Sequence, residues 1–250
     1  MTLHPSSSSS SEAPTVAIIG AGVIGLGIGW RLAAAGCRVD IFDRGAAGAG
    51  ASHAAAGMLA ASAEAEPGEE ALLALNRHSL ALWPGFAAEL EALTGQTVDL
   101  RTEGTLVLAP TADDVARLRF GLDFQKSLGL ATRWLDAAEL RRREPHVSPA
   151  VAGAVFSPED HQVDNRKLAH ALRLAVERAG GRIHERCPVT RIEIDGGRVA
   201  GIRADGTLVA ADRVVLAAGA WSRGIDGLPP EALPPVRPVK GQMLAVRMDP

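Results

Sequence analysis

The stretch Thr15-Val-Ala-Ile-Ile-Gly-Ala-Gly-Val-Ile-Gly25 decides the fold class of this chain of 250 residues. Its first part, Val16–Ile19, is a short apolar run of strand length that stops at Gly20. Helical spacing of apolar residues follows from Val23 to Ala35, and a second strand-like run covers Val39–Phe42. A strand, a glycine turn, a helix and a second strand in so short a span predict one βαβ unit with two parallel strands.

The turn after the first predicted strand has the pattern GxGxxG, formed by Gly20, Gly22 and Gly25. The first glycine allows a sharp turn, the second a close approach of the backbone to a pyrophosphate, and the third close packing of the helix on the strands. Asp43, at the end of the second strand, can accept hydrogen bonds from ribose hydroxyls and would repel a 2′-phosphate. These features predict a dinucleotide site. A glycine-rich turn beside a surface aspartate is the alternative.

The segment after the second strand, Gly48–Met58, consists largely of glycine, alanine and serine. Small side chains allow a bulky flavin to approach the backbone closely, whereas a nicotinamide enzyme would usually continue into another helix and strand. The segment therefore favours FAD over NAD. A flexible linker and a nicotinamide-dependent dehydrogenase are the alternatives.

A third piece, Val214–Ser222, joins an apolar run to a turn of small residues. It predicts a buried parallel strand, Val214–Ala217, whose end returns the chain to the cofactor. A strand that serves only the core is the alternative.

The rest of the chain predicts further helices and strands around the βαβ unit. Helices are predicted over Glu69–Leu93, with an interruption at Pro84-Gly85, and over Ala112–Leu128, Asp136–Arg143 and Asn165–Ala179. Strands are predicted over Gly104–Leu108, Arg182–His184, Val189–Ile194, Val199–Ala204, Leu208–Ala210 and Gln242–Arg247, with hairpin turns at Asp195-Gly196-Gly197 and Asp205-Gly206.

This pattern predicts an α/β fold in which a Rossmann-like FAD-binding domain is interleaved with an α+β substrate domain. The predicted parts are a disordered tail over 1–13, the FAD-binding domain over 14–97 and 150–228, and the substrate domain over 98–149 and 229–250. The chain stops at Pro250, directly after a predicted strand, so we expect the substrate domain to be incomplete.

Composition excludes several classes of partner. The formal net charge of −3 and the lack of a long basic run argue against nucleic acid and against an anionic membrane surface. Glycines and Arg31 interrupt the apolar run 16–35, so a membrane-spanning helix is not expected. Cys37 and Cys187 form no CxxC motif and are expected to be buried thiols in the cytoplasm, and no histidine spacing indicates a metal site.

The three pieces, in this order, resemble the D-amino-acid-oxidase family of FAD-dependent oxidoreductases. Within that family, Ala54–Leu59 followed by Ala63-Glu64 most resembles the glycine oxidases of thiamine thiazole synthesis. Pro238–Leu244 matches the family's strand that enters the substrate sheet, and the resemblance runs from about Thr15 to Met248. It implies the FAD-binding domain typical of this family.

The resemblance also implies a role for each matched residue. The implied FAD contacts are Gly20, Gly22, Val23, Ile24 and Gly25 at the pyrophosphate, Asp43 and Arg44 near the adenosine ribose, Ala51 and Ser52 along the phosphates and ribitol, Ala56, Gly57 and Met58 beside the isoalloxazine, Val189 at the adenine, and Ala218 and Gly219 closing the site. His53 stands where the family often has Ser or Thr, so no catalytic role is expected for it.

The implied reaction is the oxidation of a small amino acid, glycine or sarcosine, by molecular oxygen. A hydride passes from the α-carbon to the flavin, the imine hydrolyses to glyoxylate, and oxygen is reduced to hydrogen peroxide. In the family the arginine that binds the substrate carboxylate follows the region matched by Gly241–Met248, so the catalytic residues here are unknown. Arg101, Arg133 and Arg237 are weak candidates for that role.

Several alternatives remain open at this point. The chain could act on D-amino acids or sarcosine, or pass electrons to a quinone. It could also be a catalytically disabled, incomplete FAD-binding fragment. Assembly into a homo-oligomer is left open as well.

Overall fold

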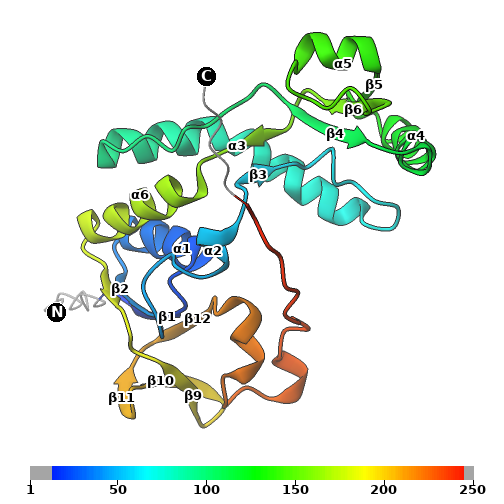
Figure 1. Cartoon of the computed structure of the whole chain (residues 1–250). Helices are drawn as coiled ribbons and strands as arrows, with labels where there is room; N and C mark the ends of the chain where they lie inside the picture. Colours follow the sequence, from blue (N-terminus) through cyan, green and yellow to red (C-terminus); the bar gives the residue numbers. More distant parts are fainter. Residues whose placement is uncertain (1–12, 245–250) are drawn as a thin grey trace, which may run out of the picture. The chain divides into compact units, whose positions relative to one another are not determined.

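The structure is a computed structural model that describes residues 13–244 (Figure 1). Apart from Ala13, the predicted tail lies outside the described residues, and so do residues 245–247 of the last predicted strand. Residues 242–244 have no regular secondary structure. The chain divides into two compact units, Met1–Ala54 with Ala169–Pro250 and Ala55–Leu168. The domain boundaries expected from the sequence stay predictions.

The first unit is built on a parallel sheet in the order β12-β1-β2-β8. Its strands are β1 (Thr15–Ile19), β2 (Arg38–Phe42), β8 (Arg182–His184) and β12 (Arg213–Leu216), and each pairs in parallel with its neighbour. Helix α1 (Val23–Ala34) connects β1 to β2, so the predicted βαβ unit is confirmed. The strand expected to be buried, β12, is parallel as predicted but only half-buried, because it lies at the edge of this sheet.

The two faces of the parallel sheet follow the alternation of side chains along its strands. Ile18 and Ile41 face α1, where a Cβ on Gly29 would lie 2.5 Å from Ile41 Cδ1. On the other face, Ala17 and Ile19 share a core with the antiparallel sheet β11-β10-β9. The first unit is therefore layered, with the parallel sheet between α1 and the antiparallel sheet (Figure 1).

The antiparallel sheet consists of β9 (Val189–Asp195), β10 (Arg198–Ala204) and β11 (Thr207–Ala210). Positive φ angles occur at Gly196 and Gly197 in one connection and at Asp205 and Gly206 in the other. Two such residues in a two-residue loop are typical of type I′ hairpins, so both predicted hairpins are confirmed.

The second unit contains an antiparallel sheet in the order β4-β6-β5 and a two-stranded pair of β3 and β7. The strands are β3 (Met58–Leu59), β4 (Thr105–Ala109), β5 (Arg133–Asp136), β6 (Gly153–Ser157) and β7 (His161–Gln162). The helices are α3 (Glu70–Thr94), α4 (Ala112–Ser127) and α5 (Ala137–Arg143). Asp136 and Glu139 form the predicted capping box of α5. Buried residues of β5, β6 and α5, together with Val151, form one hydrophobic cluster of this unit.

The remaining short elements are α2 (Ala51–Ala54), η1 (Gly219–Gly224) and η2 (Pro230–Ala232) in the first unit, and α6 (Asn165–Arg178) spans the boundary between the units.

Two further expectations about local structure were wrong. Helix α3 continues through Pro84 instead of breaking there. Pro84 is exposed, so water can satisfy the carbonyl whose partner N–H proline lacks. The two cysteines are free, as expected, but half-buried instead of buried, because they lie in turns after α1 and β8. Burial, with the charge of Asp205, raises the pKa of the Cys187 thiol. Among the described helices, none is long and apolar enough to cross a bilayer.

Candidate cofactor site

The β1–α1 turn is packed so closely that two of its glycines cannot be replaced without movement. Gly20 has a φ of +107°, and a Cβ there would lie 2.3 Å from the carbonyl oxygen of Ala217 at the end of β12. A Cβ on Gly25 would lie 1.9 Å from the carbonyl oxygen of Gly20. The outer glycines of the motif therefore close the turn against β12 and against α1, as the motif predicts.

Gly22 precedes the first residue of α1 and leaves the helix end open on one side. A Cβ there would meet only Ser52 Oγ, at 3.2 Å. The N–H groups of Gly22, Ile24 and Gly25 have no hydrogen-bond partner within residues 13–244. No acidic residue lies in the first turn of α1. Free N–H groups and the positive end of the helix dipole make this turn suited to an anion such as a diphosphate.

Asp43 links the end of β2 to the same turn. Its Oδ2 accepts a hydrogen bond from Ala21 N at 2.7 Å, and its Oδ1 accepts one from Gly45 N at 2.8 Å. Each carboxylate oxygen has a further lone pair, so ribose hydroxyls can still donate to it. Asp43 therefore both fixes the turn and remains an acceptor.

The glycine-alanine segment after β2 is bound to the turn rather than free. Gly48 N donates to Ala21 O at 2.8 Å, and Val23 N donates to Ser52 Oγ at 3.0 Å. Ala47 N donates to Glu185 Oε1 at 2.8 Å. These contacts, together with helix α2, do not support the flexible-linker alternative.

Arg44 contacts the end of the predicted segment Val214–Ser222. Its guanidinium carbon is 3.7 Å from the centroid of the Trp221 ring, which belongs to η1. Ala218 and Val189 pack against one hydrophobic cluster in this unit, and Gly219 begins η1 with a φ of +55°. In the first unit the structure thus brings Asp43, Ser52 and the end of β12 to the β1–α1 turn, whereas Val189 lies in β9 of the antiparallel sheet.

Ala56, Gly57 and Met58 belong to the second unit. Gly57 has a φ of +74°, and a Cβ there would lie 1.9 Å from Val163 O, so only glycine fits. Met58 exposes 57% of its surface. Of these residues, Met58 belongs to β3 and opposes Gln162 of β7.

A family model described as FAD dependent oxidoreductase, or DAO, matches residues 15–250. The chain belongs to this family. Glycine oxidase of Geobacillus kaustophilus is 39% identical over 234 residues, which cover 93% of this chain and 61% of that protein. The bifunctional protein ThiO/ThiG of Trichormus variabilis is 37% identical over 93% of this chain and 34% of its own length.

Solved structures agree with the family assignment. The crystal structure of the Geobacillus kaustophilus glycine oxidase has a TM-score of 0.79 and 38% identity, covering 85% of this chain and 58% of that one. L-α-glycerophosphate oxidase from Mycoplasma pneumoniae, solved with FAD bound, has a TM-score of 0.69 and 18% identity. The match covers 85% of this chain and 56% of the oxidase chain, and at this identity it shows the fold alone. The chain spans about three fifths of the length of the glycine oxidases it matches.

Family membership settles the choice of cofactor in favour of FAD rather than NAD. The residues present fit that group. The turn offers free N–H groups for the diphosphate, the open side of Gly22 gives space, and Asp43 offers acceptors for ribose. This turn is therefore the candidate FAD site of the chain.

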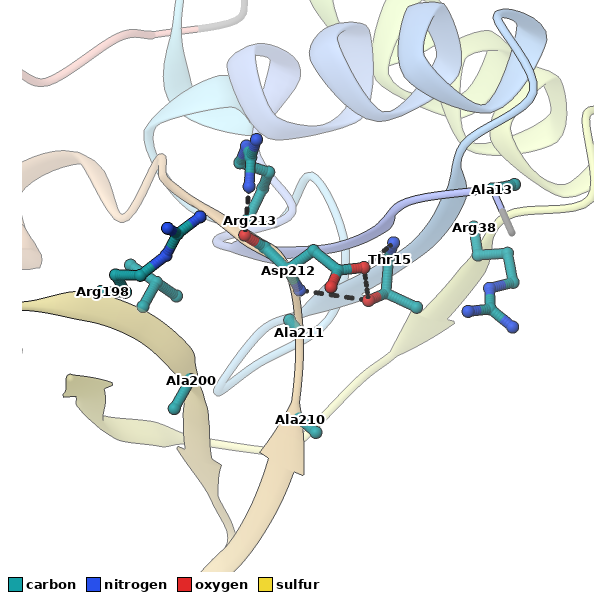
Figure 2. A pocket seen from close by; sticks show the side chains of 10 residues that line it. Ala13, Thr15, Arg38, Arg198, Ala200, Ala210, Ala211, Asp212 and Arg213 are labelled. Atoms are coloured by element: carbon teal, nitrogen blue, oxygen red, sulfur yellow. Dashed lines mark hydrogen bonds between the residues drawn. The ribbon is translucent and has the colours of Figure 1, made fainter. Parts of the chain in front are cut away.

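A large open pocket of the first unit lies elsewhere. It has a volume of about 830 Å³ and is lined by residues at the amino ends of β1, β2 and β12, including Thr15, Arg38 and Arg213 (Figure 2). In Figure 2, Arg38 and Arg198 lie on opposite sides of the Thr15–Asp212 pair, and Arg213 turns to the carbonyl of Asp212. Ligands of open α/β sheets bind at the carboxyl ends of the strands, so this pocket is not the FAD site.

The three arginine candidates lie at the surface or in surface ion pairs. Arg101 is exposed and pairs with Glu103, Arg133 pairs with Glu139, and Arg237 is exposed. None of the three lines this open pocket or a smaller pocket between Met58–Ala61 and α3 in the second unit. Residues 13–244 contain no group of three or more His, Cys, Asp or Glu side chains that could hold a metal.

Two contributors to the site were not predicted from the sequence. Trp221 lies in the predicted segment Val214–Ser222, but its contact with Arg44 depends on the fold. Ala217 contributes a backbone carbonyl, for which sequence carries no signal. An aromatic residue directly after a glycine-alanine turn at a strand end was the available signal for Trp221.

Proposed function

We propose that this chain forms the FAD-binding part of an oxidase that converts glycine or sarcosine to an imine. The observation that carries the proposal is its similarity to the glycine oxidases over nearly the whole of its length. In the proposed reaction glycine, oxygen and water yield glyoxylate, ammonia and hydrogen peroxide. FAD, when bound, supplies the hydride acceptor.

The proposed roles of the chain's own residues are binding and orientation. The N–H groups at the start of α1 bind the diphosphate, and Asp43 accepts from the ribose while Arg44 lies near it. Ala51 and Ser52 line the phosphates and ribitol. We propose that Ala56, Gly57 and Met58 lie beside the isoalloxazine, Val189 at the adenine, and Ala218 with Gly219 at the closing edge.

A role in thiamine thiazole synthesis is part of this proposal. It is supported by the similarity to relatives that are named bifunctional protein ThiO/ThiG. A cytoplasmic location is also proposed, supported by the free state of both cysteines in the described residues. Assembly into a homo-oligomer stays a prediction.

A wider range of amine substrates is the second candidate function. It is favoured by the 29% identity to 4-methylaminobutanoate oxidase of Paenarthrobacter nicotinovorans over 83% of this chain. That relative is named for a longer, N-methylated substrate. D-amino acids and a quinone acceptor remain alternatives that an experiment must separate.

A substrate panel tests the proposal. The FAD-loaded protein is mixed without oxygen with glycine, sarcosine, D-alanine or 4-methylaminobutanoate, and bleaching of the visible flavin absorption is followed. We expect glycine and sarcosine to bleach the flavin fastest, and peroxide to appear when air is admitted. A flavin that is bound but bleached faster by another member of the panel, or by none, would contradict the substrate proposal while leaving the family intact.

A further inference from the structure

The second unit contains a fully buried carboxylate that the cofactor site does not use. Asp160 is 0% exposed. Its Oδ1 accepts a hydrogen bond from Ser62 N at 2.9 Å, and its Oδ2 accepts one from Ala63 N at 2.8 Å. Ser62 and Ala63 lie almost a hundred residues before Asp160 in the sequence.

Burying a carboxylate is unfavourable unless its oxygens are hydrogen-bonded. Each carboxylate oxygen of Asp160 accepts a hydrogen bond from a backbone N–H of the turn at 61–64. These bonds offset the cost of burying the charge, and they also fix the turn. An amide in its place would direct an NH₂ group at one of these two donors. The position therefore requires a group that only accepts hydrogen bonds.

The three residues after Asp160 bind the backbone of the preceding segment, Ala56–Leu59. Gln162 Nε2 donates to Ala56 O at 3.2 Å, and Val163 N donates to Gly57 O at 2.9 Å. In the β3–β7 pair, Met58 opposes Gln162 and Leu59 opposes His161. The segment 160–163 thus contacts 56–63 along most of its length.

The segment 160–163 is itself anchored on its other side. Gln162 N donates to Arg101 O at 2.9 Å, and Arg101 N donates to Gln162 O at 2.7 Å. Asp164 N donates to Val98 O at 3.0 Å. A segment held on both sides can act as a rigid support for the residues that it contacts.

The supported segment forms one wall of a small pocket. This pocket, of about 220 Å³, is lined by the backbone segment Met58–Ala61, by Glu64, and by residues of α3 that include Trp83. The turn that Asp160 fixes contributes Ala61 and Glu64 to this wall. Movement of the turn would therefore change the pocket next to Met58.

We propose that Asp160 is a positioning residue that fixes the turn at 61–64 and thereby the segment Ala56–Ala63. The catalytic consequence rests on the proposed function, in which Ala56–Met58 lies beside the flavin. A displacement of about 1 Å of such a segment is expected to lower turnover on the order of 10- to 100-fold without removing the cofactor.

The test uses Asp160→Asn and Gln162→Ala, with Glu159→Gln and Ser62→Ala as matched controls. Glu159 is the exposed carboxylate next to Asp160, and Ser62 Oγ has no hydrogen-bond partner in the described residues. Gln162 is exposed, so its replacement tests the same support without disturbing a buried charge. The readouts are FAD affinity, kcat and KM separately, and hydrogen exchange of the Ser62 and Ala63 amides.

We expect Asp160→Asn to speed exchange of the Ser62 and Ala63 amides and to lower kcat, while FAD affinity and protection of β4–β6 remain as in the wild type. Gln162→Ala should lower kcat in the same direction, and the two controls should leave all readouts unchanged. Normal exchange at Ser62 and Ala63 in Asp160→Asn, or faster exchange with unaltered kcat and KM, would overturn the inference. Failure of the wild-type protein to bind FAD would instead count against the proposed function.

Discussion

At the scale of single residues, two glycines of α1 have different roles: Gly25 is needed for close packing, whereas Gly27 only lowers the helix propensity of its position. A Cβ on Gly25 would overlap the Gly20 carbonyl, whereas a Cβ on Gly27 would meet no atom within 4 Å. We expect Gly25→Ala to lower the free energy of unfolding by about 1–3 kcal/mol through overpacking and to weaken FAD binding. Gly27→Ala should raise the free energy of unfolding by about 0.5–1 kcal/mol through helix propensity. Urea unfolding and an FAD titration of both variants would show the contrast, and equal behaviour of the two would refute the packing argument.

At the scale of secondary-structure elements, charged side chains of the neighbouring strands β2 and β8 contact each other. Arg182 donates two hydrogen bonds to Asp40, at 2.8 and 2.7 Å, and His184 Nε2 lies 2.6 Å from Asp40 Oδ1. Burial acts to raise the pKa of Asp40, but the hydrogen bonds and charges of Arg182 and His184 outweigh it and lower that pKa below 3.8. A lowered pKa means that the stabilisation is present above the unfolded value and is lost as the pH falls through the folded value.

We therefore expect wild-type protein to be more stable than Asp40→Asn near neutral pH, by a small amount because solvent screens the exposed Arg182. The difference should shrink as the pH falls below 3.8, where the wild-type carboxylate also becomes neutral. Urea unfolding of both proteins over a series of pH values measures this. A difference that widens below that pH would be inconsistent with the assignment.

The elements that sequence predicted well are those with a local signal. Periodicity and glycine chemistry revealed β1, α1, β2 and both hairpins, because each depends on neighbouring residues. The pair β3–β7 was not predicted, since it joins Met58 to Gln162 across the unit. β6 was missed because its short, fully buried run shows no alternation. Of the site, Gly20 and Asp43 followed from motif and spacing, whereas the contact of Arg44 with Trp221 required the fold.

At the scale of the whole molecule, folding and cofactor binding are thermodynamically linked. A ligand that binds only the folded state stabilises it by about 2.7 kcal/mol at a concentration 100 times its dissociation constant. The free N–H groups of the β1–α1 turn and the acceptors of Asp43 exist only when β1, α1 and β2 are assembled. FAD should therefore raise the unfolding midpoint of the chain.

This linkage can be measured by thermal unfolding of the 250-residue chain with and without saturating FAD, alongside NAD and the Gly25→Ala variant. We expect a clear rise of the midpoint with FAD, no rise with NAD, and a smaller or absent rise with FAD in Gly25→Ala. A well-folded wild-type protein whose midpoint is unaffected by FAD, or is raised as much by NAD, would contradict it.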